Sequence, residues 1–148
     1  MKKVLVVLLI LVLTFIWGNS CKTVADSRDE SKSFMEFIEP FLELFVGEGN
    51  VTLHLVRKLA HFTEFAALGA GLAGVFSSFR WQRRRLALLL PPLAALLIAV
   101  SDEVIQIFSP ARGPGVRDVL LDFCGALFGI VCMRLLLRLI DRAGKKDT

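Results

Sequence analysis

Long apolar stretches dominate the pattern of hydrophobic and polar positions along this chain. Residues 59–79 and 86–108 contain few charged side chains, and a third stretch, about 119–140, carries charges only near its ends. An α-helix rises about 1.5 Å per residue, so each stretch is long enough to cross a hydrocarbon core of about 30 Å. Arg134 and Arg138 in the third stretch can extend to the membrane interface. The pattern therefore predicts an all-α integral membrane bundle.

The first apolar segment, about residues 4–20, has two interpretations. Its apolar core is short for a membrane span, and it follows the basic residues Lys2 and Lys3. A basic start, a short apolar run and small residues before Cys21 are also typical of a cleavable signal peptide. A lipoprotein signal fits less well, because Gly18 stands where a large aliphatic residue is expected. The predicted bundle thus has four helices, and the sequence leaves open whether the first is retained or cleaved.

A different pattern occupies the one long connection, residues 18–56. Over residues 34–45, apolar side chains recur at helical spacing and glutamates fall on the opposite face. Ser33 begins a capping-box pattern and Gly47 is a suitable stop, whereas Pro40 would kink the helix or delay its start. We expect a short amphipathic helix packed across the outer mouth of the bundle. Simple contact with the membrane surface is the alternative.

The charges indicate how the helices are oriented. The chain has 18 basic and 14 acidic residues and a formal net charge of +4. With four spans and both termini in the cytoplasm, eleven basic and two acidic residues lie beside the inner span ends, against seven basic and twelve acidic ones outside. This distribution follows the positive-inside rule, so we expect a multi-pass membrane protein with both termini in the cytoplasm if the first segment is retained. Orientation then accounts for the basic charge, which no longer supports a nucleic-acid partner.

The three cysteines, Cys21, Cys124 and Cys132, provide neither a disulfide framework nor a zinc-ligand spacing. The last two lie within an apolar stretch, where cysteine usually behaves as a small hydrophobic residue. We therefore expect Cys124 and Cys132 to be buried on a helix.

Three polar clusters lie within the spans or at their ends. Ionisable side chains inside a membrane cost about 2.5–3.5 kcal/mol each on insertion scales, so each needs a structural or functional reason. In the predicted topology, all three clusters reach the outer ends of the spans. Small residues Gly125 and Gly129 continue the helix face of Asp122, which favours close helix packing there. The clusters are Arg57, Lys58, His61 and Glu64; Asp102, Glu103, Gln106 and Arg112; and Arg117, Asp118 and Asp122.

The segments that carry these clusters resemble motifs of the VanZ-like family of bacterial membrane proteins. Residues 57–65 are similar to its R-K-x-x-H-F-x-E-[YF] motif, 101–112 to D-E-x-x-Q-x-F-x-P-x-R, and 117–126 to R-D-x-x-x-D/N-x-x-G-A. The resemblance implies a single membrane domain over residues 1–148 with a motif-bearing core at 57–130. It also implies a link to antibiotic resistance, because the members that give the family its name are associated with reduced susceptibility to the glycopeptide teicoplanin.

Two functions of different classes fit these clusters. The first is a membrane enzyme that acts on a lipid-linked or cell-envelope substrate, with His61, Glu64, Asp102 and Glu103 as acid–base candidates. The second is a protein that binds or shields an envelope lipid or glycopeptide without chemistry. In either case the bilayer is the surrounding partner. The remaining polar residues are then ligand-binding candidates: Arg57, Lys58, Gln106, Arg112, Arg117, Asp118 and Asp122.

A purely structural role is the third interpretation of the same groups. Arg57 with Glu64, Arg112 with Asp102, and Arg117 with Asp118 could form ion pairs that fix the helix register. The carboxylates are also suitable ligands for a hard cation. The sequence does not decide whether the protein has a metal or another cofactor.

Overall fold

The computed structural model describes residues 2–21, 24–47, 49–79, 84–108 and 115–144, and over these residues the chain forms five α-helices and no strand. The prediction of an all-α architecture is confirmed. The helices are α1 (Lys2–Ser20), α2 (Val24–Val46), α3 (Leu53–Ser77), α4 (Arg84–Ile107) and α5 (Val116–Gly144).

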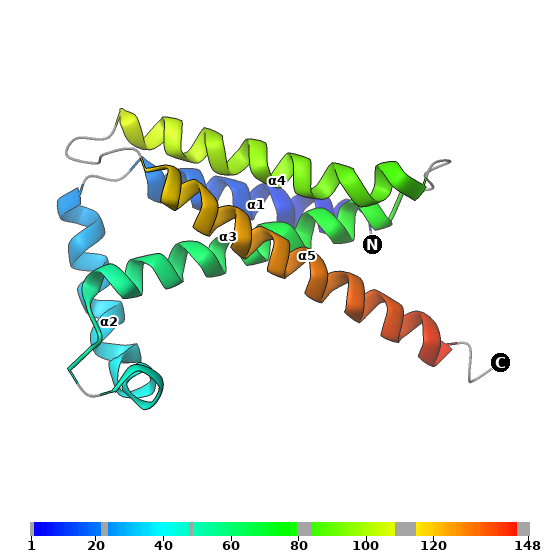
Figure 1. Cartoon of the computed structure of the whole chain (residues 1–148). Coiled ribbons are helices and arrows are strands. Elements are labelled where there is room, and N and C mark those ends of the chain that lie inside the picture. Colours follow the sequence, from blue (N-terminus) through cyan, green and yellow to red (C-terminus); the bar gives the residue numbers. More distant parts are fainter. Residues whose placement is uncertain (1, 22–23, 48, 80–83, 109–114, 145–148) are drawn as a thin grey trace.

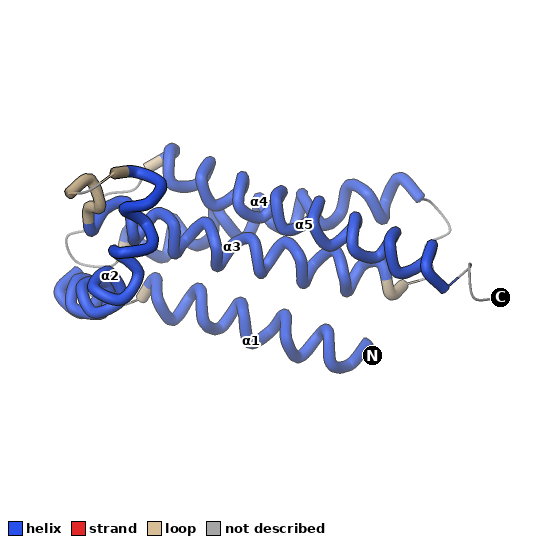
Figure 2. Tube along the Cα trace, turned by 90° about the horizontal axis from the view of Figure 1, so that it is seen from below, coloured by secondary structure: helices blue, strands red, loops and turns tan. Residues whose placement is uncertain are grey.

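Four of these helices, α1, α3, α4 and α5, are long and apolar enough to cross a membrane. They run along one another, and α2 lies at one end of the bundle they form (Figure 1). At this end, called here the α2 end, α1 and α4 finish and α3 and α5 begin; α1 begins and α5 finishes at the opposite end (Figure 2). The helix directions therefore bring the described residues of the three predicted polar clusters to the same end of the bundle.

Helices α3 and α5 pack against each other more extensively than any other pair in the described chain. They cross near the middle of α5 (Figure 1), where small residues let the two backbones approach closely. A β-carbon added at Gly125 would overlap the backbone of Phe62, and one added at Gly129 would overlap that of Ala66. Asp122, Gly125 and Gly129 are all buried, so the predicted inward-facing stripe of α5 is confirmed.

The first helix is packed into the bundle. Its Ile16 side chain is fully buried in a cluster with Phe65 and Leu68 of α3 and Ala99 of α4. Ser20, the last residue of α1, is also fully buried. The C-terminal part of α1 therefore contributes to the core of the bundle.

The outer surfaces of the helices are rich in exposed apolar side chains, such as Leu97 and Phe128. Cys124 and Cys132 are exposed on α5, so the prediction that they are buried was wrong. A membrane helix is apolar on the face turned to lipid as well as on the face turned to its neighbours. An apolar stretch in such a helix therefore does not reveal which of its residues lie inside the protein.

Two prolines inside α4 shape its contact with α5. Pro91 and Pro92 have no backbone N–H, so they cannot donate to the carbonyl groups four residues earlier, those of Ala87 and Leu88. The Arg134 guanidinium of α5 donates to both carbonyl oxygens, at 3.2 Å and 2.9 Å. Arg134 therefore replaces missing backbone hydrogen bonds of α4, a role beyond the interfacial one that we expected.

Helix α2 is longer than predicted. It begins at Val24 rather than near Ser33, and it contains Pro40. It ends as expected before Gly47, which has a φ of 86° and donates its N–H to the Glu43 carbonyl oxygen at 2.9 Å. Phe37 is 84% exposed, and Phe34, Phe41, Leu44 and Phe45 are also exposed. These five side chains therefore do not pack across the mouth of the bundle, and contact of α2 with the membrane surface stays a prediction.

Candidate functional site

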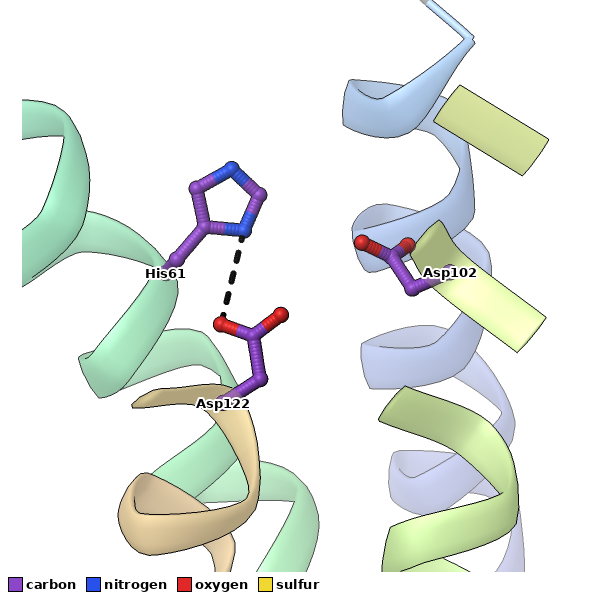
Figure 3. Close-up of side chains that lie close together, drawn as sticks. All are labelled: His61, Asp102 and Asp122. Carbon is purple, nitrogen blue, oxygen red and sulfur yellow. Dashed lines mark ion pairs between the residues drawn. The ribbon is translucent and has the colours of Figure 1, made fainter. Parts of the chain in front are cut away.

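Three helices each supply one side chain to a compact group at the α2 end. His61 lies in the first turns of α3, Asp102 near the end of α4, and Asp122 in the first turns of α5. One nitrogen or oxygen atom from each residue lies within 4.8 Å of the others. Figure 3 shows the Asp122 carboxylate below the His61 ring, with the Asp102 carboxylate to their right on the neighbouring helix. The structure thus brings together residues from all three predicted clusters.

The two aspartates of this group are buried between helices. Asp102 is 0% exposed and Asp122 is 2% exposed. The His61 Nδ1 atom lies 4.0 Å from Asp122 Oδ1, which is within ion-pair range but beyond hydrogen-bond distance. Within the described part of the chain, Asp122 Oδ1 has no hydrogen-bond partner. The group therefore places two carboxyl groups where desolvation makes each negative charge expensive.

Neutral donors on two helices hold the Asp102 carboxylate. The Ser20 hydroxyl of α1 donates to Asp102 Oδ1 at 2.6 Å, and the Gln106 amide donates to Oδ2 at 2.8 Å. Gln106 lies one turn after Asp102 on α4, so the predicted i, i+4 relation places it within reach. Both oxygens of Asp102 are thereby fixed in direction.

The two glutamates of the predicted site also have defined partners. The Asn19 amide of α1 donates to Glu64 Oε1 at 3.0 Å. The backbone N–H of Gly115, just before α5, donates to Glu103 Oε1. Glu103 is 7% exposed, so it is a third buried carboxylate beside Asp102 and Asp122. Glu64 and Glu103 thus link α1 to α3 and α4 to the start of α5.

Two of the three ion pairs expected from the sequence, Arg57 with Glu64 and Arg117 with Asp118, are not formed. Lys58 Nζ of α3 lies 3.1 Å from Asp118 Oδ1 of α5, so Asp118 pairs with Lys58 instead of Arg117. Among the described residues, Arg57 and Arg117 form no ion pair. Arg112, expected to pair with Asp102, lies outside the described residues. Arg57 is half-buried and Arg117 is exposed, so the guanidinium groups of both residues are accessible to a ligand.

Asn19 and Ser20 are site residues that sequence reasoning missed. The sequence indicates them only as small residues before a signal-peptide cleavage point at Cys21. In the structure they occupy the last turn of α1 and contact Glu64 and Asp102. The available signal was their position: α1 must end at the same level as the polar clusters if four spans alternate across the membrane.

Of three comparisons with known proteins, one found a match, to a protein family. Searches of curated proteins and of solved structures found no match to the chain. The sequence pattern of a protein family described as VanZ/LLP1 matches residues 5–138, from the start of α1 almost to the end of α5. The matched range includes α2, α3 and α4 completely, most of α1 and α5, and all described site residues. The chain is therefore a member of the VanZ/LLP1 family.

Proposed function

We propose that this protein binds or acts on a cell-envelope lipid or a glycopeptide-like ligand at the α2 end of its helix bundle. The observation that carries the proposal is the convergence of His61, Asp102 and Asp122 from three helices of the family-matched region. Buried polar groups are costly in a membrane, and a group assembled from several helices is typical of a binding or catalytic site.

The charge distribution supports placing this site at the outer face of the bacterial cell membrane. The opposite end of the bundle carries Lys2 and Lys3 at the start of α1 and Arg138 and Arg142 near the end of α5. Positively charged residues favour the cytoplasmic side. Both termini would then be cytoplasmic, and the α2 end would face the compartment where envelope precursors and glycopeptide antibiotics are found.

An anionic headgroup is the ligand chemistry that the flanking residues fit. Arg57 lies one turn before His61 on α3, Arg117 lies in the first turn of α5, and in the described chain neither forms an ion pair. Guanidinium groups bind phosphate and carboxylate by paired hydrogen bonds. A lipid-linked precursor with a phosphate-containing headgroup would place its charge near these arginines and its acyl portion among the apolar helices.

In the catalytic version of this proposal, His61 or Glu64 acts as the general base on the bound headgroup. The alternative is binding or shielding without chemistry. One observation favours that alternative: the carboxylates of Glu64, Asp102 and Glu103 each accept hydrogen bonds from α1, α4 or the start of α5. Carboxylates held in this way stabilise helix contacts and orient a ligand without needing to exchange protons.

Purified full-length protein in lipid nanodiscs tests the proposal. The probes are teicoplanin and a polyprenyl-pyrophosphate-linked muropeptide, with binding measured by calorimetry and products by mass spectrometry. Wild type should bind at least one of the two, and His61→Ala and Asp102→Asn should weaken binding about tenfold or more. Glu43→Gln, which alters a carboxylate on α2, is the matched control and should bind like wild type.

The products separate the two versions. A new product formed by wild type and lost in His61→Ala supports catalysis, whereas binding with no product supports the shielding protein. Failure of folded wild type to bind either probe contradicts the proposal.

A further inference from the structure

The group formed by His61, Asp102 and Asp122 has the composition of a metal site. An imidazole nitrogen and two carboxylate oxygens come from three helices and lie within 4.8 Å of one another. Ligands of one Zn²⁺ at about 2.0–2.2 Å from the ion lie about 3.4 Å apart in tetrahedral geometry. Small side-chain rotations would therefore bring all three atoms onto a single ion.

A cation also fits the local charge. Asp102 and Asp122 are almost completely shielded from solvent, and Glu103 lies on the same turn of α4 as Asp102. The nearby Lys58 forms its ion pair with Asp118, which lies one turn before Asp122 on α5. In the described chain, no lysine or arginine forms an ion pair with Asp102 or Asp122. Two adjacent buried carboxylates repel each other unless a proton or a cation lies between them.

Asp122 supplies a second and independent indication of a ligand. Its Oδ1 atom is buried and accepts no hydrogen bond from the described residues, although it points toward His61 (Figure 3). Buried carboxylate oxygens are normally satisfied by donors. The His61 imidazole lies beside this oxygen, with its Nδ1 atom 4.0 Å away. A nitrogen and an oxygen at this separation are arranged as two ligands of one metal ion would be.

We propose that His61, Asp102 and Asp122 bind one divalent transition-metal cation, such as Zn²⁺ or Mn²⁺, with one ligand atom each. Imidazole favours transition metals, whereas an all-oxygen set would favour Mg²⁺ or Ca²⁺. Ser20 and Gln106 would orient the Asp102 carboxylate, as outer hydrogen-bond partners do in metal sites. With three protein ligands, further positions on the ion stay open for water or an anionic ligand.

The cation site goes beyond the proposed function, because it requires no lipid or glycopeptide. If His61 holds the ion, Glu64 remains as the candidate base for any chemistry on a bound headgroup. Cation binding can therefore be measured on its own. A protein that binds metal but neither envelope probe would support this inference and contradict the proposed function.

The test uses full-length protein in nanodiscs, stripped with a chelator and titrated separately with ZnCl₂, MnCl₂ and MgCl₂. Wild type should take up about one Zn²⁺ or Mn²⁺ per chain and bind Mg²⁺ more weakly. Asp122→Asn and His61→Ala should weaken Zn²⁺ binding about a hundredfold, and Ser20→Ala about tenfold. Asp141→Asn, an exposed carboxylate at the far end of α5, is the control and should bind Zn²⁺ like wild type.

Pulsed electron paramagnetic resonance of the Mn²⁺-loaded wild type tests whether a histidine binds the metal. This measurement remains possible if a variant of a ligand residue does not fold in the membrane. Wild type should show coupling to an imidazole nitrogen, and His54→Ala should keep it, since His54 is the exposed second histidine of the chain. Three results would each overturn the inference: no metal uptake by folded wild type, unweakened Zn²⁺ binding by folded Asp122→Asn, or bound Mn²⁺ without nitrogen coupling.

Discussion

Arg134 shows how a single side chain can repair a break in a neighbouring helix. The carbonyl oxygens of Ala87 and Leu88 lose their helical partners to Pro91 and Pro92, and Arg134 donates to both. In a bilayer no water replaces a missing backbone partner away from the interface, so such oxygens are satisfied within the protein. The same guanidinium that is expected to reach the membrane interface thus also joins α5 to α4.

We therefore expect Arg134→Leu to lower the free energy of unfolding by about 1–2 kcal/mol, because two carbonyl oxygens lose their donor. The magnitude stays modest because one of the two hydrogen bonds is exposed. Unfolding of the detergent-solubilised protein by sodium dodecyl sulfate, followed by circular dichroism, measures the change. Arg138→Leu is the matched control, since Arg138 is exposed on the next turn of α5. Equal loss in both variants would contradict the role given to Arg134.

The sequence predicted that Arg134 reaches toward the interface but not what it binds. The prolines that create the two free carbonyl groups are visible in the sequence, forty-odd residues before the arginine. Which helix faces α4 at that level depends on tertiary packing. For the same reason the sequence predicted that three polar clusters meet at one level but paired Asp118 with Arg117 instead of Lys58. Spacing along one helix is readable, whereas contacts between helices are not.

At the scale of elements, the packing of α3 on α5 depends on residues that lack a side chain. Gly129→Ala would place a β-carbon against the backbone of Ala66, and a backbone atom cannot move aside as a flexible side chain can. We expect this substitution to lower the free energy of unfolding by about 1–3 kcal/mol, the usual cost of overpacking. The same unfolding assay measures it.

Gly18→Ala is the matched control for this prediction. A β-carbon at Gly18 of α1 meets nothing within 4 Å, so the substitution should leave stability unchanged or raise it slightly through helix propensity. If Gly129→Ala were as well tolerated as Gly18→Ala, the close approach of α3 and α5 would not contribute to stability as described.

Apolar length predicted the four long helices, because a membrane demands it of every span. It was less informative for α2, which is not constrained in this way. The apolar repeat begins at Phe34, so the first ten residues of α2 give no periodic signal. Polar and charged residues can nevertheless form a helix, because their helix propensities are adequate. Ser33 fits a capping box and yet lies inside the helix. A capping-box pattern marks the start of a helix only where the residues before it are not already helical.

At the scale of the whole molecule, the function proposed here depends on orientation and on retention of α1. Ile16 and Ser20 are fully buried against α3 and α4, and the family pattern extends back to residue 5. Cleavage after Ser20 would separate from the bundle a helix that supplies hydrogen bonds to Glu64 and Asp102. We therefore predict that α1 stays as a membrane anchor with its start in the cytoplasm.

Cys21 is a native reporter for this prediction. It is exposed at the end of α1, whereas Cys124 and Cys132 lie within the span formed by α5. A membrane-impermeant maleimide added to intact spheroplasts should therefore label the full-length protein at Cys21, and Cys21→Ser should abolish the labelling. Acylation of Cys21 would block its thiol, and cleavage would shift the labelled band by about 2 kDa.

A cysteine introduced at Ser77, at the opposite end of the bundle, should react only after the membrane is permeabilised. If the reagent labelled Ser77→Cys but not Cys21 from outside, the topology would be the opposite of the predicted one. The proposed metal site and ligand site would then face the cytoplasm instead of the cell envelope.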